Sequence, residues 1–301
     1  MIRQWFERRR ISSSEEILDE MLGELADLNR SYRHIYGLRN SLTPFIRRFP
    51  HLEKVRHSDV VEYLREISQR VGPRRRDNIL AAIVQYSRFA RRHDHLPEDR
   101  RSAAEKVWRI KPSHDIETWT PPEAALILEY VSRDWLPSVA LGLFAGLRPS
   151  EILRLDWNAI KFDEGEIRVS ARVARKIRIS RVVPIQPNLA AWLEPYRDRV
   201  GPLYPGNFKT NENAHSREMA RIRRLTGLPR KDNALRHSYG SYRLAVIKNR
   251  PQLAEEMGNS PRMIRENYND PKSEREGAAY FALAPAIFEN VVPMPLALEF
   301  R

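Results

Sequence analysis

Apolar side chains recur every three or four residues between positions 13 and 105, which is the spacing of one face of an α-helix. A first helix is predicted where Ser13 and Glu16 form a capping box, and a second where Ser58 can cap the chain. A third helix ends before Pro97. The apolar residues that these helices should bury are Ile17, Leu18, Met21, Leu22, Leu25, Leu28, Val61, Leu64, Ile67, Ile79, Leu80, Ile83, Val84 and Phe89. The pattern predicts an all-helical region over residues 13–105.

A polar linker, residues 106–119, separates this region from the second half of the chain. Residues 120–123 read Thr-Pro-Pro-Glu, which combines a helix cap, a proline at the first helical position and a capping-box glutamate. After residue 148 the pattern becomes alternating, and the segments that predict a small antiparallel sheet are residues 166–170, 173–181 and 182–185. Helices return at 189–196 and 216–226, and Gly227 ends the latter. The fold class is therefore mainly α, with an α+β second domain.

The charge balance points to a polyanionic partner. The 301 residues, enough for two domains, contain 52 Lys and Arg against 39 Asp and Glu, a net charge of +13 with a pI near 10.1. The basic residues recur along the whole chain rather than on one amphipathic segment, which favours nucleic acid over a membrane surface. A soluble basic protein without such a partner is the alternative on charge alone.

Several classes of protein and site are not expected. The chain has no cysteine, so it forms no disulfide and no thiolate metal site. The first ten residues are not followed by an apolar run, and the uncharged run at 136–147 is too short to span a bilayer. His93 and His95 lie two apart without an evident carboxylate cluster, so no metal site is expected. These features predict a cytoplasmic protein without membrane attachment.

Three consecutive cations, Arg74, Arg75 and Arg76, stand where the third helix should begin. Cations at a helix N-terminus oppose the helix dipole unless an anion lies there. Binding of a DNA phosphate would resolve the conflict. A solvated loop just ahead of the helix is an equally open interpretation.

The second half contains four segments suited to phosphate chemistry. Residues 146–151 read Gly-Leu-Arg-Pro-Ser-Glu, and residues 233–237 read Asn-Ala-Leu-Arg-His on a helical pattern. Residues 257–259 read Met-Gly-Asn, and Tyr268 follows nine residues after Asn259. Two guanidiniums can take up charge that develops on phosphate oxygens, and a tyrosine oxygen can act as a nucleophile.

In this order and spacing the four segments resemble the tyrosine recombinase (phage integrase) family over about residues 118–290. That family carries Gly-Leu-Arg-x-x-Glu, then His-x-Leu-Arg-His, Gly-His and a nucleophilic tyrosine. The resemblance implies a core-binding, SAM-like DNA-binding domain over 13–105 and a catalytic domain over 120–290. A basic segment, 1–12, and a C-terminal tail, 291–301, flank them.

The resemblance also implies roles for individual residues. Tyr268 attacks phosphorus and forms a 3′-phosphotyrosyl link, while Arg148 and Arg236 stabilise the charge, and Glu151 holds Arg148. Lys176, five residues ahead of the Arg-Val-Val-Pro segment at 181–184, protonates the leaving 5′ oxygen; a solvated hairpin lysine is the alternative. The link conserves bond energy, so neither ATP nor a metal is required.

Two positions depart from the family pattern. Asn233 stands where the family has histidine three residues before the second arginine, and Asn259 stands where it has histidine or tryptophan. Asparagine donates hydrogen bonds but does not titrate near neutral pH. One hypothesis for removal of the Tyr268 proton involves His237, one helical turn after Asn233; a structural role for His237 is the alternative.

The expected function is site-specific DNA recombination or integration, as in mobile elements, by a nucleoid-associated homotetramer on paired duplex sites. The apolar segment 278–284, followed by Ile287 and Phe288, either packs on its own domain or, as the family implies, docks in trans. The first rival is a catalytically impaired relative that binds DNA as a regulatory or architectural protein. A helix-turn-helix transcription factor is the second, and it leaves the four segments unexplained.

Overall fold

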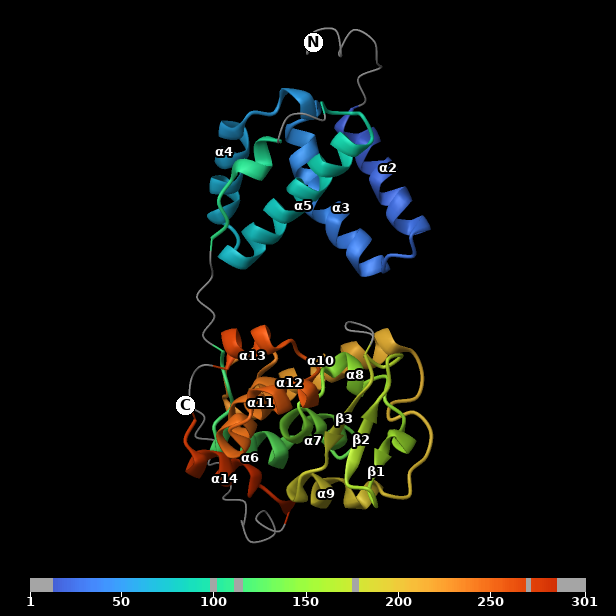
Figure 1. The fold of residues 1–301 in the computed structure, drawn as a ribbon, viewed down its shortest axis with the longest axis vertical. Coiled ribbons are helices and arrows are strands. Elements are labelled where there is room, and N and C mark those ends of the chain that lie inside the picture. Colours follow the sequence, from blue (N-terminus) through green and yellow to red (C-terminus); the bar gives the residue numbers. More distant parts are fainter. Residues whose placement is uncertain (1–12, 98–101, 111–115, 175–178, 269–271, 286–301) are drawn as a thin grey trace, which may run out of the picture. The chain divides into compact units, whose positions relative to one another are not determined.

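The structure is a computed structural model that describes residues 13–97, 102–110, 116–174, 179–268 and 272–285. The chain divides into two compact units, residues 1–113 and 114–301 (Figure 1). Within the described ranges the fold is mainly α-helical with one small three-stranded antiparallel sheet, as predicted.

In the first unit, four helices of the described residues surround one apolar core. The capping box of Ser13 and Glu16 is present, and the Tyr86 hydroxyl donates to Ser14 O at 2.7 Å, which ties the last helix to the first. The helices are α2 (Ser14–Asp27), α3 (Tyr32–Arg48), α4 (His57–Ser68) and α5 (Pro73–Arg92). Short 3₁₀ turns cover Leu52–Lys54 and Ala103–Lys106.

Helix α3 was not predicted from the sequence. Pro44 lies inside it, and a proline ordinarily ends a helical pattern. The helix nevertheless buries a stripe at helical spacing, made of Leu38, Ser41, Leu42, Phe45 and Ile46. Burial of this stripe against α2 and α5 outweighs the missing backbone donor.

The predicted start of α4 is wrong by two positions. Arg56, not Ser58, caps the helix, because its backbone N–H donates to the Asp59 carboxylate at 2.9 Å. The buried face is consequently Val60, Tyr63 and Leu64, whereas the predicted Val61 and Ile67 are half-buried. Leu28 is another exception in the predicted core, since it follows the end of α2 and is 59% exposed.

His93 and His95 have no evident carboxylate cluster near them in the sequence, but in the structure a glutamate of α2 contacts each of them. Glu20 Oε2 lies 2.8 Å from His95 Nε2, and Glu24 Oε2 lies 3.1 Å from His93 Nε2. Both glutamates, Glu20 and Glu24, belong to α2, which is far from His93 and His95 in the sequence. Their contact therefore could not be predicted from neighbouring residues. The interaction links α2 to the end of α5.

The second unit places its sheet among nine helices of the described residues. Thr120 caps α6 with Glu123 in the predicted capping box. The helices are α6 (Pro121–Tyr130), α7 (Leu136–Ala145), α8 (Pro149–Ile152), α9 (Pro187–Leu193), α10 (Phe208–Thr226), α11 (Ala234–Ile247), α12 (Arg250–Met257), α13 (Pro261–Asn267) and α14 (Glu274–Phe281). Short 3₁₀ turns cover Trp157–Ala159 and Glu194–Tyr196. The strands are β1 (Ile160–Lys161), β2 (Glu166–Val169) and β3 (Arg181–Pro184).

The strand order is β1-β2-β3, with Ile167 opposite both Ile160 and Val183. The predicted strand over 173–181 is wrong before Arg181 in the part that the structure describes, because Val173 lies in a turn and residues 174, 179 and 180 lie in no strand. The N–H groups of Val173 and Ala174 donate to Ser170 O at 3.0 and 2.9 Å, which closes that turn. A local hydrogen bond thus overrides the alternating pattern.

Helix α7 is the centre of this unit, and every residue from Pro137 to Ala145 is buried. α11 packs on it, and α14 packs on α11 (Figure 1). Within the described residues no helix is long and apolar enough to cross a membrane.

The apolar segment that begins at residue 278 packs on its own unit as far as Leu283. Tyr280 is fully buried and donates to Leu143 O at 3.0 Å, and Trp192 Nε1 donates to Leu283 O at 2.9 Å. The segment is nevertheless exposed at Ala278 and Ala279. Ile287 and Phe288 lie outside the described residues.

Candidate active site

Arg148 lies at the N-terminus of the short helix α8. Its backbone N–H and its guanidinium both bind Glu151, with 2.9 Å from Nη1 to Oε1. Gly146 makes this position possible, since it ends α7 with φ +61°, and a Cβ there would lie 2.9 Å from Cγ of Tyr239.

Arg236 is buried on α11, with 6% of its surface exposed. Its Nη1 donates to Gly146 O and its Nη2 to Met257 O, the latter at 2.5 Å. These carbonyls belong to the C-terminal turns of α7 and α12, where the helix dipole favours a cation. Burial, followed by the charge of Arg148, lowers the pKa of Arg236 to about 9.

The two guanidiniums converge on Asn259. Arg148 Nη2 donates to Asn259 Oδ1 at 2.9 Å, and Arg236 Nη2 donates to the same oxygen at 3.0 Å. Gly258, with φ +59°, turns the chain at the end of α12, and its carbonyl accepts from Arg148 at 3.2 Å. Residues from α7, α8, α11 and α12 therefore meet at a single point.

Glu151 balances part of this positive charge. Arg181, at the start of β3, donates to both of its oxygens, at 2.7 and 3.2 Å, and also to Glu256 O at 3.0 Å. Burial acts to raise the pKa of Glu151, but the hydrogen bonds from Arg181 prevail and lower it. Sequence reasoning treated Arg181 only as a strand marker; its place in an Arg-x-Val-Pro segment was the available signal.

A second buried network lies behind these residues, centred on Glu256. Its carboxylate accepts from the Tyr239 hydroxyl at 2.7 Å, from Arg243 at 2.9 and 3.0 Å, and from Gln252 at 2.9 Å. Because Arg181 donates to the backbone carbonyl of Glu256, this network fixes the end of α12 against β3.

Tyr268 directly follows α13 and is 3% exposed. In the sequence Tyr268 stands among the polar residues Glu266, Asn267, Asn269 and Asp270, which predicts a position outside a core. This prediction is wrong, because its ring packs with Tyr239, Met257 and Ile264. Gly240 provides the space, since a Cβ there would lie 2.6 Å from Cζ of Tyr268. Polarity of adjacent residues does not fix the direction of one side chain.

The Tyr268 hydroxyl lies 3.2 Å from Nδ1 of His237. Burial, followed by the charge of Arg236, lowers the pKa of His237 to about 4, so the imidazole is neutral at neutral pH. Burial raises the pKa of Tyr268, and the charges of Arg236 and Arg148 oppose that rise. A neutral imidazole is thus available as an acceptor for the tyrosine proton.

The remaining sequence candidates in this unit are less well placed. Asn233 caps α11 in the left-handed conformation, with φ +54°, and makes no side-chain cap hydrogen bond. It is exposed, and with Arg236 it lines a pocket of about 400 Å³. Lys176 lies outside the described residues.

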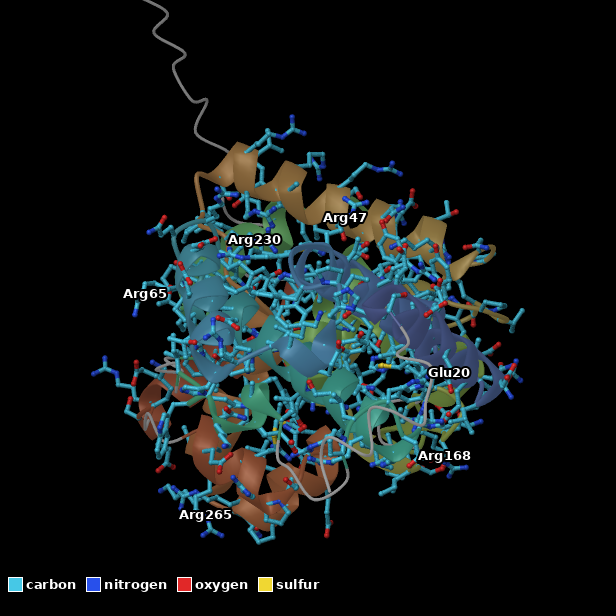
Figure 2. All side chains as sticks on the ribbon, turned by 90° about the horizontal axis from the view of Figure 1, so that it is seen from above. Glu20, Arg47, Arg65, Arg168, Arg230 and Arg265 are labelled. Atoms are coloured by element: carbon cyan, nitrogen blue, oxygen red, sulfur yellow. The ribbon has the colours of Figure 1, made fainter. Side chains whose placement is uncertain are left out.

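In the first unit, the three arginines lie inside the first turn of α5, so the interpretation as a loop ahead of the helix is wrong. Arg76 pairs with Asp77 at 2.6 Å and donates to Trp108 O at 3.1 Å. Arg74 and Arg75 are exposed. Other exposed arginines, such as Arg65 and Arg265, are labelled at the edge of the view in Figure 2. Two cations of this turn are therefore open to an external anion.

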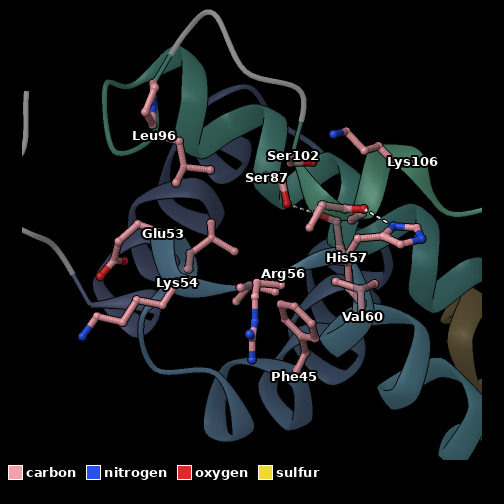
Figure 3. A pocket seen from close by; sticks show the side chains of 16 residues that line it. Phe45, Glu53, Lys54, Arg56, His57, Val60, Ser87, Leu96, Ser102 and Lys106 are labelled. Carbon is pink, nitrogen blue, oxygen red and sulfur yellow. Dashed lines mark hydrogen bonds between the residues drawn. The ribbon is translucent and has the colours of Figure 1, made fainter. Parts of the chain in front are cut away.

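The first unit also contains a pocket of about 290 Å³, shown in Figure 3. Its wall is about equally polar and apolar, and His57 Nδ1 lies 3.3 Å from Ala103 O at its edge. Glu53 Oε1 is buried without a hydrogen-bond partner in this wall. Within the described residues no group of three or more His, Asp or Glu is placed to hold a metal ion.

Comparison with known proteins gives both a sequence and a structural likeness. The sequence model of the Phage integrase family matches residues 138–258. A lambda integrase dimer bound to a COC′ core site is similar, with 15% identity, a TM-score of 0.70, and coverage of 87% of this chain and 98% of that chain. A Tn1549 transposon integrase in complex with a circular intermediate DNA has 14% identity, a TM-score of 0.68, and coverage of 90% and 99%.

A lambda integrase tetramer bound to a Holliday junction is similar at 14% identity and a TM-score of 0.67, covering 87% of this chain and 80% of that chain. A search of curated protein sequences found no match. At these identities the structural likeness establishes the fold.

Proposed function

We propose that the chain is a member of the tyrosine recombinase (phage integrase) family, whose sequence model matches residues 138–258, and that it is a site-specific DNA recombinase or integrase. One observation carries the proposal. The guanidiniums of Arg148 and Arg236 converge within 3.0 Å of a single point, and Tyr268 and His237 lie beside Arg236. This is an anion site next to an oxygen nucleophile.

In the proposed reaction, Tyr268 Oη attacks the phosphorus of one DNA strand. The 5′ oxygen leaves, and a 3′-phosphotyrosyl bond replaces the broken phosphodiester bond, so no energy source is needed. Negative charge on the non-bridging oxygens is stabilised by Arg148 and Arg236 through charge-assisted hydrogen bonds. Glu151 holds Arg148, as its 2.9 Å contact supports.

Two protons have to move. His237 accepts the proton of Tyr268, which its neutral state and its distance of 3.2 Å support. Lys176 donates a proton to the leaving 5′ oxygen, a role that rests on the family resemblance. Asn233 and Asn259 bind phosphate oxygens and transfer no proton.

The proposed organisation follows the sequence boundaries. Residues 13–105 act as the core-binding domain after a basic segment, 1–12, and the linker 106–119 leads to the catalytic domain 120–290 and the tail 291–301. Arg74, Arg75 and Arg76 face DNA phosphate, with Arg76 also held by Asp77. Duplex DNA is the partner.

Four copies act on paired sites, with the C-terminal tail docked in a neighbouring copy. The neighbours that are integrases bound to a core site and to a Holliday junction support a multimer on DNA, whereas docking of the tail rests on the family resemblance. Integration of a mobile element is the proposed biological reaction, as the transposon integrase neighbour supports.

A second candidate is a DNA-binding protein that does not cleave. The observation in its favour is that Asn233 replaces the histidine of the family, that Asn259 replaces its histidine or tryptophan, and that Tyr268 is buried. Both candidates bind DNA, so binding alone does not separate them.

Nicked duplexes that trap the covalent intermediate separate the two. Candidate sites from DNA flanking the gene are incubated with protein and run on denaturing gels, with Tyr268→Phe as the test and Tyr36→Phe, at a position that is 53% exposed, as the control. We expect an adduct that Tyr268→Phe abolishes and Tyr36→Phe retains. Sites that are bound by folded protein but never cleaved would establish the DNA-binding candidate instead.

A further inference from the structure

The point where the two arginines converge is already occupied in the DNA-free chain. Asn259 Oδ1 accepts from Arg148 at 2.9 Å and from Arg236 at 3.0 Å. A guanidinium has donors and no acceptor, so the amide oxygen, and not the amide nitrogen, has to face both of them. An oxygen that bridges two guanidiniums is the arrangement that a phosphate oxygen adopts.

The other acceptors around these arginines are fixed in place. Gly146 O, Met257 O and Gly258 O belong to the main chain at helix ends, and Glu151 is itself held by Arg181. Asn259 is a short side chain with two rotatable bonds. Among the described partners of both arginines, it is the one that can turn away without moving the backbone.

We propose that Asn259 is a positioning residue whose amide oxygen imitates a phosphate oxygen between the two guanidiniums and is displaced when the DNA phosphate binds. Rotation about its Cβ–Cγ bond then turns Nδ2 toward the phosphate as a donor. This rests on the proposed function, and it adds a regulated step to that site.

The charge balance favours the exchange. Three guanidiniums, of Arg148, Arg181 and Arg236, surround a single carboxylate, Glu151. The neutral amide oxygen leaves this excess positive charge uncompensated, whereas a phosphodiester brings a full negative charge. Hydrogen bonds to an ionised acceptor are about twice as strong as those to a neutral one.

The amide oxygen also holds the guanidiniums of Arg148 and Arg236 in position. Without an acceptor between them, the two guanidiniums would lose a shared hydrogen-bond partner and repel each other. Asn259 therefore stabilises the DNA-free protein and competes with phosphate. A residue with only a structural role would stabilise the protein but would not compete with phosphate.

The test measures binding of inorganic phosphate by calorimetry, together with the melting temperature of the full chain. For Asn259→Ala we expect a lower melting temperature without phosphate and a phosphate Kd about tenfold lower than that of the wild type. For Asn259→Asp, a carboxylate that binds both arginines and repels phosphate, we expect a Kd at least about tenfold higher. Arg148→Lys identifies the site, since it should reduce the same binding event.

Asn249 provides a matched control at the other end of α12. Its side chain accepts from Gln252 N at 3.0 Å and caps the helix. Asn249→Ala should lower the melting temperature and leave the phosphate Kd unchanged. If Asn259→Ala weakens phosphate binding or leaves it unchanged, Asn259 does not compete with phosphate, and the proposal is overturned.

The covalent-adduct assay tests recombination, and its result is independent of the phosphate-binding measurement. A phosphate Kd that falls in Asn259→Ala without any adduct in the wild type would retain the displacement of Asn259 and reject recombination. An adduct in the wild type with no such change in Kd would retain recombination and reject the displacement.

Discussion

Arg236 is the residue on which the geometry of the site depends most. It is buried, and its donors reach Gly146 O, Met257 O and Asn259 Oδ1 on two separate segments of chain. A planar guanidinium can bind these acceptors together because its donors diverge in fixed directions. A side chain with the same charge and a different shape cannot.

Arg236→Lys should therefore destabilise the protein by about 1–3 kcal/mol, because buried carbonyls lose their donors. The measurement is urea unfolding followed by circular dichroism. Arg230→Lys is the control, since the Arg230 side chain is 78% exposed. Equal stabilities of the two variants would contradict the role assigned to the guanidinium shape.

His237 should make stability depend on pH. Its pKa in the folded chain is about 4, below the ordinary value of 6.5, so the unfolded chain binds more protons between these values. Its contribution is present above pH 6.5 and is lost as the pH falls to 4. The unfolding free energy of His237→Gln should fall less over that window than that of the wild type. His34→Gln, at an exposed position, should behave as the wild type.

At the scale of elements, packing against α11 decides where the nucleophile lies. Tyr268 follows α13, and its ring fits against α11 because Gly240 has no side chain. A glycine inside a helix costs about 1 kcal/mol relative to alanine. The close approach of Tyr268 accounts for that cost.

Gly240→Ala should accordingly lower stability by about 1–3 kcal/mol and reduce the yield of the covalent adduct, because the ring is displaced. Gly37→Ala in α3 is the matched control. An added Cβ there meets nothing within 4 Å, so this variant should gain about 0.5–1 kcal/mol. Adduct yield and thermal unfolding are measured on both. A Gly240→Ala variant that is as stable and as active as the wild type would show that the ring does not need this space.

Elements were predictable where local signals marked their ends. The caps at Ser13, Thr120 and Gly227 gave correct boundaries, since each depends on residues within one turn. Helix α3 and the two-residue strand β1 were missed, because their stability comes from tertiary burial and pairing rather than from local sequence. The order of the motifs also identified the residues that meet around Asn259, whereas the burial of Tyr268 depends on Gly240, 28 positions away.

At the scale of the whole molecule, a net charge of +13 should make DNA binding strongly dependent on salt. Cations that are paired with a carboxylate of the protein are not expected to contribute to this salt dependence. An example is Arg39, which lies 3.0 Å from Asp19. Exposed cations that have no such partner among the described residues, including Arg74 and Arg75, are expected to contribute.

Arg74→Ala and Arg75→Ala should each weaken DNA binding for all sequences alike and reduce the slope of log K against log salt by about 1. Fluorescence anisotropy over a series of salt concentrations measures this slope. Arg39→Ala should leave it unchanged. A slope that is the same in all three variants would remove the first turn of α5 from the DNA interface.

The acceptors around the two arginines have a consequence for genetic screens of this protein. Gly146, Met257 and Gly258 contribute main-chain carbonyls, and a carbonyl survives every substitution of the side chain. An alanine scan at Met257 would report only the loss of packing and would overlook its hydrogen bond to Arg236. Side-chain mutagenesis therefore does not test the hydrogen bonds that these three carbonyls accept. A change of the backbone itself, such as an amide-to-ester exchange by semisynthesis, is needed to test them.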